Sequence, residues 1–100
     1  MKESQIEARL VRGVKALGGR AYKFVSPGNT GVPDRLVVLP GGRIIFVELK
    51  TDVGKLSPMQ IRQIDFLRSR GVPVRVLYGM EAVEEFLKGL KLDLVGGDAE

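Results

Sequence analysis

The sequence predicts an α/β domain with a mixed central β-sheet flanked by helices, in the order helix, strand, strand, strand, helix, strand, helix. Two short apolar runs, residues 36–39 and 44–47, are separated by Pro-Gly-Gly, which is the pattern of a β-hairpin. Two Ser-x-x-Glu/Gln segments precede amphipathic stretches, which is the pattern of helix starts. The segment after the hairpin is long enough for a crossover between parallel strands.

The first predicted helix extends to about Leu17, with Ser4 as its N-cap residue and Glu7 closing a capping box. Apolar residues recur at helical spacing along it, so that one stripe is expected to be buried: Ile6, Leu10, Val14 and Leu17. Residues 20–25 alternate as a strand. A loop of small, turn-forming residues, 26–31, then leads into the hairpin.

The second predicted helix has Ser57 as its N-cap, Pro58 in its first turn and Gln60 closing another capping box, and it ends at Gly71. Residues 72–78 form the last predicted strand, parallel to the second hairpin strand through a right-handed crossover. A final helix is expected from residue 80 to 90. We therefore predict a single domain over residues 1–91 and a flexible C-terminal tail over residues 92–100.

Composition restricts the possible chemistry. The 100 residues include no Cys and no His, which excludes disulfides, thiolate metal sites, zinc-finger ligands and histidine bases. Any bound metal must therefore be held by oxygen. No apolar run has the length of a membrane span, and the first residues lack the apolar centre of a signal peptide. We expect a cytoplasmic protein, inside a bacterium, phage or host cell, that is not secreted.

Charge is distributed unevenly along the chain. Residues 1–75 hold fourteen Lys and Arg against six Asp and Glu, whereas residues 76–100 hold two against six. A polyanion such as DNA or RNA would be attracted to the first three-quarters of the chain, although ordinary solubility explains such charge equally well. The candidate nucleic-acid contacts are Arg9, Arg12, Lys23, Ser26, Asn29, Arg35 and Lys55.

Three ionisable residues lie at the open end of the predicted hairpin: Asp34, Glu48 and Lys50. Glu48 and Lys50 are two apart on one strand and so share a face. A two-residue turn would pair residue i with 83 − i and place Asp34 on the wrong face. A three-residue turn pairs i with 82 − i and places Asp34 opposite Glu48. We predict the second register, because Gly42 suits the left-handed position of such a turn.

Two neighbouring carboxylates repel each other, and a divalent cation removes that conflict. Oxygen ligands favour Mg²⁺, with Mn²⁺ as a substitute, and the Leu49 carbonyl is a further candidate ligand. Lys50 would position or deprotonate a water molecule bound to that cation, or stabilise negative charge in the transition state of a reaction at this site. The competing interpretation is structural: Asp34 caps a turn, and Glu48 and Lys50 form a surface ion pair.

The order Pro33-Asp34 followed by Glu48-Leu49-Lys50 resembles the PD-(D/E)xK nuclease signature. Residues 31–35 (Gly-Val-Pro-Asp-Arg), 47–50 (Val-Glu-Leu-Lys) and 57–60 (Ser-Pro-Met-Gln) resemble the VRR-NUC (virus-type replication-repair nuclease) family. The resemblance covers roughly residues 4–80 and implies a restriction-endonuclease-like core. The short signature alone is weak, whereas the ordered set with its flanking helices is much more specific.

The resemblance also implies roles for two residues that otherwise serve as helix caps. Related nucleases carry a Glu on the first helix that reaches the metal site, and Glu7 is the matching position. A Gln near the catalytic lysine faces the active site, and Gln60 matches it, where it would orient the water or a phosphate. Capping remains an equally good interpretation of both.

These features predict a Mg²⁺-dependent endonuclease that hydrolyses DNA phosphodiester bonds. Compact members that this chain resembles act as dimers on four-way (Holliday) junctions, and two sites related by a twofold axis suit paired cuts. We therefore expect a homodimeric junction resolvase. A flap-type or general DNA nuclease is the alternative within enzymes, and a non-catalytic nucleic-acid-binding module is the alternative outside them.

Overall fold

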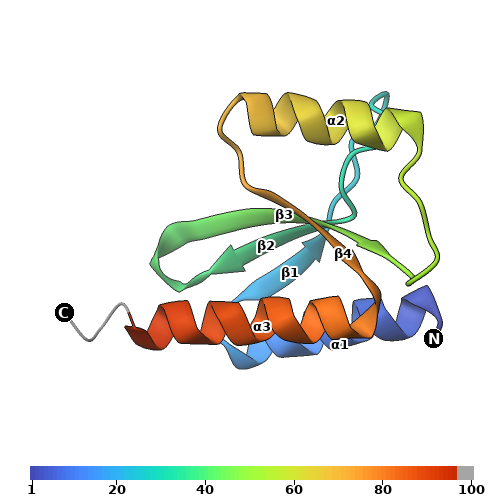
Figure 1. Cartoon of the computed structure of the whole chain (residues 1–100). Coiled ribbons are helices and arrows are strands. Elements are labelled where there is room, and N and C mark those ends of the chain that lie inside the picture. Colours follow the sequence, from blue (N-terminus) through green and yellow to red (C-terminus); the bar gives the residue numbers. More distant parts are fainter. Residues whose placement is uncertain (97–100) are drawn as a thin grey trace.

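The computed structural model describes residues 1–96, and its elements follow the predicted order (Figure 1). The hairpin turn is a short 3-10 segment, η1, and the elements are α1 (Glu3–Ala16), β1 (Arg20–Lys23), β2 (Arg35–Leu39), η1 (Pro40–Gly42), β3 (Arg43–Lys50), α2 (Pro58–Ser69), β4 (Val74–Tyr78) and α3 (Gly79–Gly96). No helix within these residues is both long and apolar enough to cross a lipid bilayer.

The four strands form one mixed sheet in the order β1-β2-β3-β4, with the β2–β3 hairpin in the centre. β1 pairs antiparallel with β2, and β2 pairs antiparallel with β3. β4 pairs parallel with β3, so α2 is the crossover between them. The predicted α/β architecture is therefore confirmed, including the central hairpin and the parallel last strand.

The hairpin register is the one predicted from a three-residue turn. Arg35 is opposite Val47 and Leu39 is opposite Arg43, so paired residue numbers add to 82. Gly41 and Gly42 have φ angles of +83° and +79°, a backbone conformation that side chains with a Cβ rarely adopt. The two glycines thus let the chain reverse over three residues, which sets the register for the whole hairpin.

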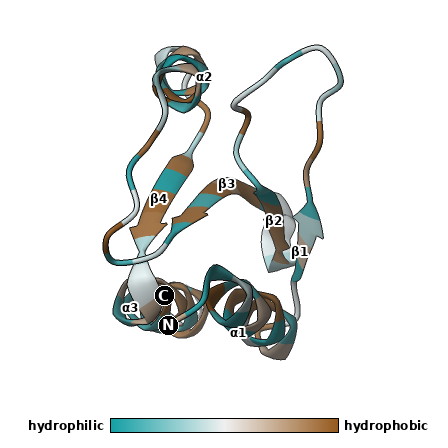
Figure 2. Cartoon of the chain, turned by 90° about the vertical axis from the view of Figure 1, so that its right-hand side faces the viewer, coloured by the Kyte–Doolittle hydropathy of each residue, from teal (hydrophilic) through white to brown (hydrophobic). Residues whose placement is uncertain are grey.

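The two faces of the sheet are covered differently. α1 and α3 lie side by side on one face, and α2 alone lies on the other (Figure 1). Alternate residues of β3 point to the α1–α3 side and join the main apolar core: Ile45, Val47 and Leu49. Figure 2 shows α1 and α3 together below the sheet and α2 above it, with apolar (brown) segments in the strands and in the two lower helices. The predicted α1 stripe is also there, with Ile6, Leu10 and Val14 at most 1% exposed.

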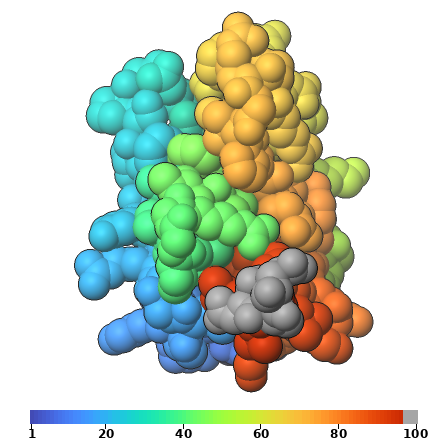
Figure 3. Space-filling model, turned by 90° about the vertical axis from the view of Figure 1, so that its left-hand side faces the viewer, coloured from blue at the N-terminus to red at the C-terminus, as the bar shows by residue number. Residues whose placement is uncertain are grey.

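α2 and the loop between β1 and β2 are neighbours above the sheet, as Figure 3 shows on the hairpin side of the molecule. Gly31 in this loop has φ +93°, and a Cβ at this position would lie 2.6 Å from the Met59 carbonyl carbon. The loop backbone therefore packs directly on the first turn of α2. Gln63 Nε2 adds a hydrogen bond of 3.4 Å to the Thr30 carbonyl.

Both terminal helices differ from the prediction at one end. α1 begins at Glu3, and Gln5 Oε1 accepts from the Lys2 N–H at 2.9 Å, so Ser4 is not the N-cap and Glu7 does not close a capping box. α3 continues to Gly96 because no Gly or Pro lies between Leu90 and Gly96 and an Arg43–Asp93 ion pair of 2.9 Å joins its last turns to the hairpin. The predicted tail is therefore helical over 92–96, and 97–100 lie outside the described residues.

Candidate active site

Glu48 is the one buried charged side chain among residues 1–96, with 1% of its surface exposed. It lies on β3 between Val47 and Leu49, whose side chains belong to the apolar core on the α1–α3 side. Because side chains alternate along a strand, Glu48 points to the opposite face, toward α2. A buried carboxylate is costly unless polar groups compensate it, so its surroundings define the candidate site.

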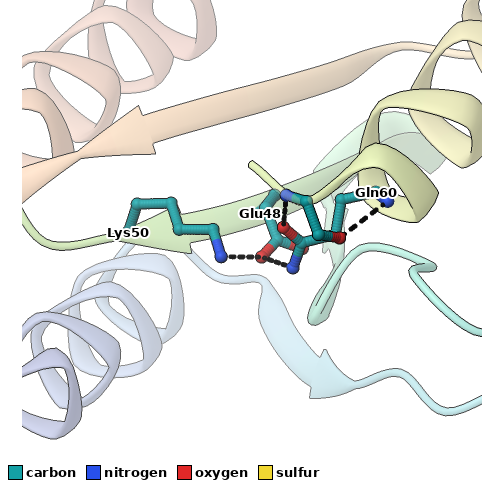
Figure 4. Close-up of polar contacts among 4 residues, drawn as sticks. Glu48, Lys50 and Gln60 are labelled. Atoms are coloured by element: carbon teal, nitrogen blue, oxygen red, sulfur yellow. Dashed lines mark hydrogen bonds and ion pairs between the residues drawn. The ribbon is translucent and has the colours of Figure 1, made fainter. Parts of the chain in front are cut away.

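Two partners contact the same oxygen of Glu48 (Figure 4). Gln60 Nε2 donates to Glu48 Oε2 at 3.1 Å, and Lys50 Nζ lies 3.8 Å from the same atom. The other oxygen, Oε1, is buried and has no hydrogen-bond partner in the part of the chain that the structure describes. The site therefore holds one compensated and one uncompensated carboxylate oxygen.

Asp34 immediately precedes β2, and one further step of the hairpin register places it opposite Glu48. Burial first, and then the negative charge of Asp34, raise the pKa of Glu48 to about 7, while Lys50 opposes the shift. The register places the two carboxylates on the same face of the hairpin, and the direction of the pKa shift agrees with that placement. The predicted convergence of Asp34, Glu48 and Lys50 is therefore present in the fold.

Gln60 combines the two arrangements that the sequence left open. Its backbone N–H donates to Ser57 Oγ at 3.1 Å, and its side-chain Oε1 accepts from the Ser57 N–H at 2.8 Å, which completes the capping box. The remaining end of the side chain, Nε2, donates to Glu48. The same residue thus caps α2 and reaches the buried carboxylate from the first turn of that helix.

Comparisons with known proteins show which family the chain belongs to. The model of the VRR-NUC domain family matches residues 2–81. The chain belongs to the VRR-NUC domain family. A phage protein named "Putative nuclease p44", from Acyrthosiphon pisum secondary endosymbiont phage 1, is 53% identical over 77 residues, which are 77% of this chain and 83% of the phage protein. A solved structure described as a VRR_NUC domain aligns with a TM-score of 0.81 and 34% identity, over 86% of this chain and 94% of its own.

The VRR-NUC resemblance seen in the sequence is therefore confirmed, and so is the fold that it implied. The family and the phage relative support a nuclease, whose substrate is nucleic acid. The matched region contains Asp34, Glu48, Lys50 and Gln60, so the polar cluster lies inside the VRR-NUC domain.

Glu7 is placed differently from the expectation for a VRR-NUC metal ligand. Its Oε1 lies 3.1 Å from Arg35 Nη2, and within residues 1–96 no group of three or more Asp and Glu side chains has an arrangement that could hold a metal ion. Arg35 is adjacent to Asp34 in sequence but points to the α1 side, where Arg35 Nη1 also donates to the Ala21 carbonyl at 3.2 Å. In this conformation Glu7 therefore neutralises Arg35 instead of joining the two carboxylates.

The candidate nucleic-acid contacts divide into two groups. Arg35 has only 13% of its side chain exposed, and Arg9 forms a two-bond ion pair with Glu84 on α3 at 2.6 and 2.9 Å, so the structure gives both guanidinium groups protein partners. Asn29 donates to Ser26 Oγ at 2.8 Å within the loop. The exposed cations that remain among the predicted contacts are Arg12, Lys23 and Lys55.

A divalent cation would fit the VRR-NUC site on two structural observations. Glu48 Oε1 is buried without a hydrogen-bond partner within residues 1–96, and the hairpin register places a second carboxylate, Asp34, opposite Glu48. A cation would compensate the buried oxygen and would reduce the repulsion between the two carboxylates. All available donors are oxygens, which suits Mg²⁺ or Mn²⁺. The Leu49 carbonyl as a third ligand stays a prediction.

The sequence did not reveal two contacts of the site. One is the Glu7–Arg35 pair, which depends on how α1 crosses the sheet and has no local pattern. The other is the direction of the Gln60 side chain. The Ser-x-x-Gln spacing signals the capping box, but only the fold shows that the free end of Gln60 meets Glu48.

Proposed function

We propose that this VRR-NUC chain is a Mg²⁺-dependent, structure-specific DNA endonuclease, and that it acts as a homodimer on four-way junctions. The observation that carries the chemistry is the pairing of Asp34 with the buried Glu48, next to Lys50 and Gln60 on one face of the hairpin. A binding module would gain nothing from a buried carboxylate with an uncompensated oxygen.

Each residue has a role that follows from its position. Asp34 and Glu48 would hold the cation, which supplies positive charge for the phosphodiester and its attacking water. Lys50 is part-buried, with 18% of its side chain exposed, and would position that water or take its proton. Gln60 holds the Glu48 carboxylate in place. Within residues 1–96 the side-chain hydrogen bond and the ion pair of Glu48 come from Gln60 and Lys50 and from no Ser or Tyr, so we propose direct hydrolysis without a covalent intermediate.

The proposed dimer is supported by apolar surface that the single chain leaves uncovered. The face of the sheet opposite α1 and α3 carries α2 alone (Figure 1). Several large apolar side chains remain strongly exposed, among them Val25 at 68%, Phe66 at 54% and Ile44 at 46%. A symmetric contact would cover part of this surface and would place two sites for the paired cuts that a junction requires.

Cleavage of labelled DNA tests the proposal. A four-way junction, a flap and a plain duplex are each incubated with the protein in Mg²⁺ and in EDTA, beside the Lys50→Ala variant. We expect symmetric nicks in the junction, with Mg²⁺ only, and a loss of about 10²-fold or more in Lys50→Ala. The mass of the protein in solution should be twice that of one chain.

Each part of the proposal fails on a different result. Undiminished cleavage by Lys50→Ala would remove the role of that residue. A monomer that cuts flaps and junctions at equal rates would refute the junction assignment and leave the hydrolytic chemistry intact. Binding without cleavage in Mg²⁺ and in Mn²⁺ would instead favour a nucleic-acid-binding module.

A further inference from the structure

We propose that the backbone N–H of Ser57 fixes the direction of the Gln60 side chain and keeps its amide nitrogen turned to Glu48, which makes Ser57 a positioning residue of the site. The consequence for catalysis rests on the proposed nuclease function, whereas the orientation itself does not.

The two ends of a glutamine amide are similar in shape and opposite in chemistry. The Nε2 end donates two hydrogen bonds, and the Oε1 end only accepts. If Gln60 turned its amide over, Oε1 would face Glu48 Oε2 across the present 3.1 Å contact. When Glu48 is ionised, as it must be to hold a cation, these two oxygens are both acceptors and would repel each other. The site therefore needs something that distinguishes the two ends.

The capping box supplies that distinction. The Ser57 N–H donates to Gln60 Oε1 at 2.8 Å, and a backbone N–H can only donate. The oxygen end of the amide must therefore face Ser57, and Nε2 must face Glu48. Ser57 Oγ also accepts from the Gln60 N–H at 3.1 Å, which holds the backbone of the same turn in place.

α1 shows the same bond without the same consequence. There the Lys2 N–H donates to Gln5 Oε1 at 2.9 Å, and Gln5 is exposed. At α2 the corresponding glutamine is part-buried, and its other end bonds a carboxylate that is 1% exposed. The start of α1 is thus an internal control: an equivalent cap that does not contact the site.

Two substitutions at Ser57 separate its two hydrogen-bonding groups. Ser57→Ala removes Oγ and keeps the N–H, whereas Ser57→Pro removes both. Ser57 has φ −75° and ψ 161°, a conformation that proline adopts readily. Because both variants lack Oγ, the difference between them isolates the N–H that contacts Gln60.

The first measurement is the side-chain NH₂ signal of Gln60 in the ¹⁵N-labelled, metal-free protein, with the signals of Gln5 and Gln63 as references. In the wild type and in Ser57→Ala we expect the Gln60 NH₂ signal to be displaced from the two reference signals, and its protons to exchange slowly with water. In Ser57→Pro the exchange should become about tenfold faster. Lys2→Pro should change the environment of Gln5 and leave the Gln60 signal unchanged.

The second measurement is the rate of DNA cleavage in saturating Mg²⁺. We expect kcat of Ser57→Pro to be about tenfold below that of Ser57→Ala, with KM changed less than twofold, and kcat of Lys2→Pro to equal the wild-type value. If Ser57 had a merely structural role, kcat of both serine variants would instead fall in proportion to their loss of thermal stability.

An unchanged Gln60 signal in Ser57→Pro would overturn the proposal, and so would a lost signal with undiminished kcat. If the wild type cuts no DNA, the proposed function fails, and the amide signal alone then decides the orientation. If Ser57→Pro does not fold, Gln60→Ala replaces it. Exchange of the Ser57 amide proton should then become about tenfold faster, and an unchanged rate would refute the bond.

Discussion

Glu48 and its neighbours on β3 are equally buried and serve opposite purposes. Val47, Glu48 and Leu49 are at most 1% exposed. The two apolar side chains face α1 and α3, where 14 buried residues form a continuous core among residues 1–96. Glu48 faces α2, where its partners are an amide, an ammonium group and a second carboxylate.

Burial on the α1–α3 face stabilises the fold by roughly 25 cal/mol for each Å² of apolar surface, whatever the direction of the contact. Burial of Glu48 costs free energy, which directional contacts from Gln60 and Lys50 only partly offset, since Oε1 stays unpartnered. A single strand therefore carries both the centre of the core and the centre of the chemistry, and the alternation of side chains keeps them apart.

The largest expected effect on cleavage comes from the face of the sheet that carries Glu48 and lies toward α2. Glu48→Gln keeps the shape of the side chain and removes its charge, so we expect cleavage to fall by about 10³-fold or more, because the site loses half of its proposed ligand charge. The free energy of unfolding of the metal-free protein at pH 7 should stay the same or rise, because the buried charge is gone. Cleavage assays and urea unfolding measure the two quantities.

A matched substitution on the other face should give the opposite result. Leu49→Ala removes a core side chain that is 1% exposed, and we expect it to lower the free energy of unfolding by about 2–5 kcal/mol. The cleavage rate of the fraction that remains folded should change far less than in Glu48→Gln. A stability loss of the same size in Glu48→Gln would contradict the distinction between the two faces.

The pH dependence of the free energy of unfolding should also come from Glu48 and its face of the sheet. The pKa of Glu48 is raised to about 7 in the folded protein, so it holds a proton between about pH 4.5 and 7 that the unfolded chain releases. Its contribution is complete below pH 4.5 and is lost as the pH rises through 7, by about 3 kcal/mol.

Urea unfolding of the metal-free protein at pH 4.5, 6 and 8 measures this contribution, as the difference between the wild type and Glu48→Gln. As the pH rises, the wild type should become less stable relative to Glu48→Gln. Mg²⁺ should restore the stability of the wild type most strongly at pH 8. A difference that does not vary with pH would mean that the pKa of Glu48 is ordinary.

A smaller effect is expected where the loop before Asp34 packs on α2. Gly31→Ala places a Cβ 2.6–2.8 Å from backbone atoms of Met59 and Gln60, at a φ of +93° that alanine rarely adopts. We expect a destabilisation of roughly 1–3 kcal/mol and weaker cleavage, because the loop must move away from the turn that positions Gln60.

Gly28→Ala is the control for this substitution. It has a similar φ of +82°, but the space around its Cβ is open. It should share the cost of backbone strain and leave the cleavage rate of the folded protein unchanged. Equal cleavage by the two variants would show that the contact between the loop and α2 does not matter for the site.

Short sequence patterns predicted the helix start at α2 and the hairpin register, but they did not predict contacts between segments that are distant in sequence. The turn length around Gly42 gave the register, and the Ser57 capping box gave the start of α2, because both depend on residues close in sequence. The side of the sheet on which Arg35 lies, and its pairing with Glu7, depend on how α1 crosses β2. Packing of this kind leaves no recognisable pattern in a single amino-acid sequence.

Binding of Mn²⁺ to the metal-free protein tests the central claim most directly, because a paramagnetic ion broadens the NMR signals of the nuclei near it. At pH 8, the signals of Asp34, Glu48 and Leu49 should vanish at substoichiometric Mn²⁺, while those of the last turns of α3, which contact Arg43 at the opposite end of β3, persist. Glu48→Gln should abolish the effect. Broadening that is centred elsewhere, or that is unchanged in Glu48→Gln, would show that this pair of carboxylates does not hold the cation.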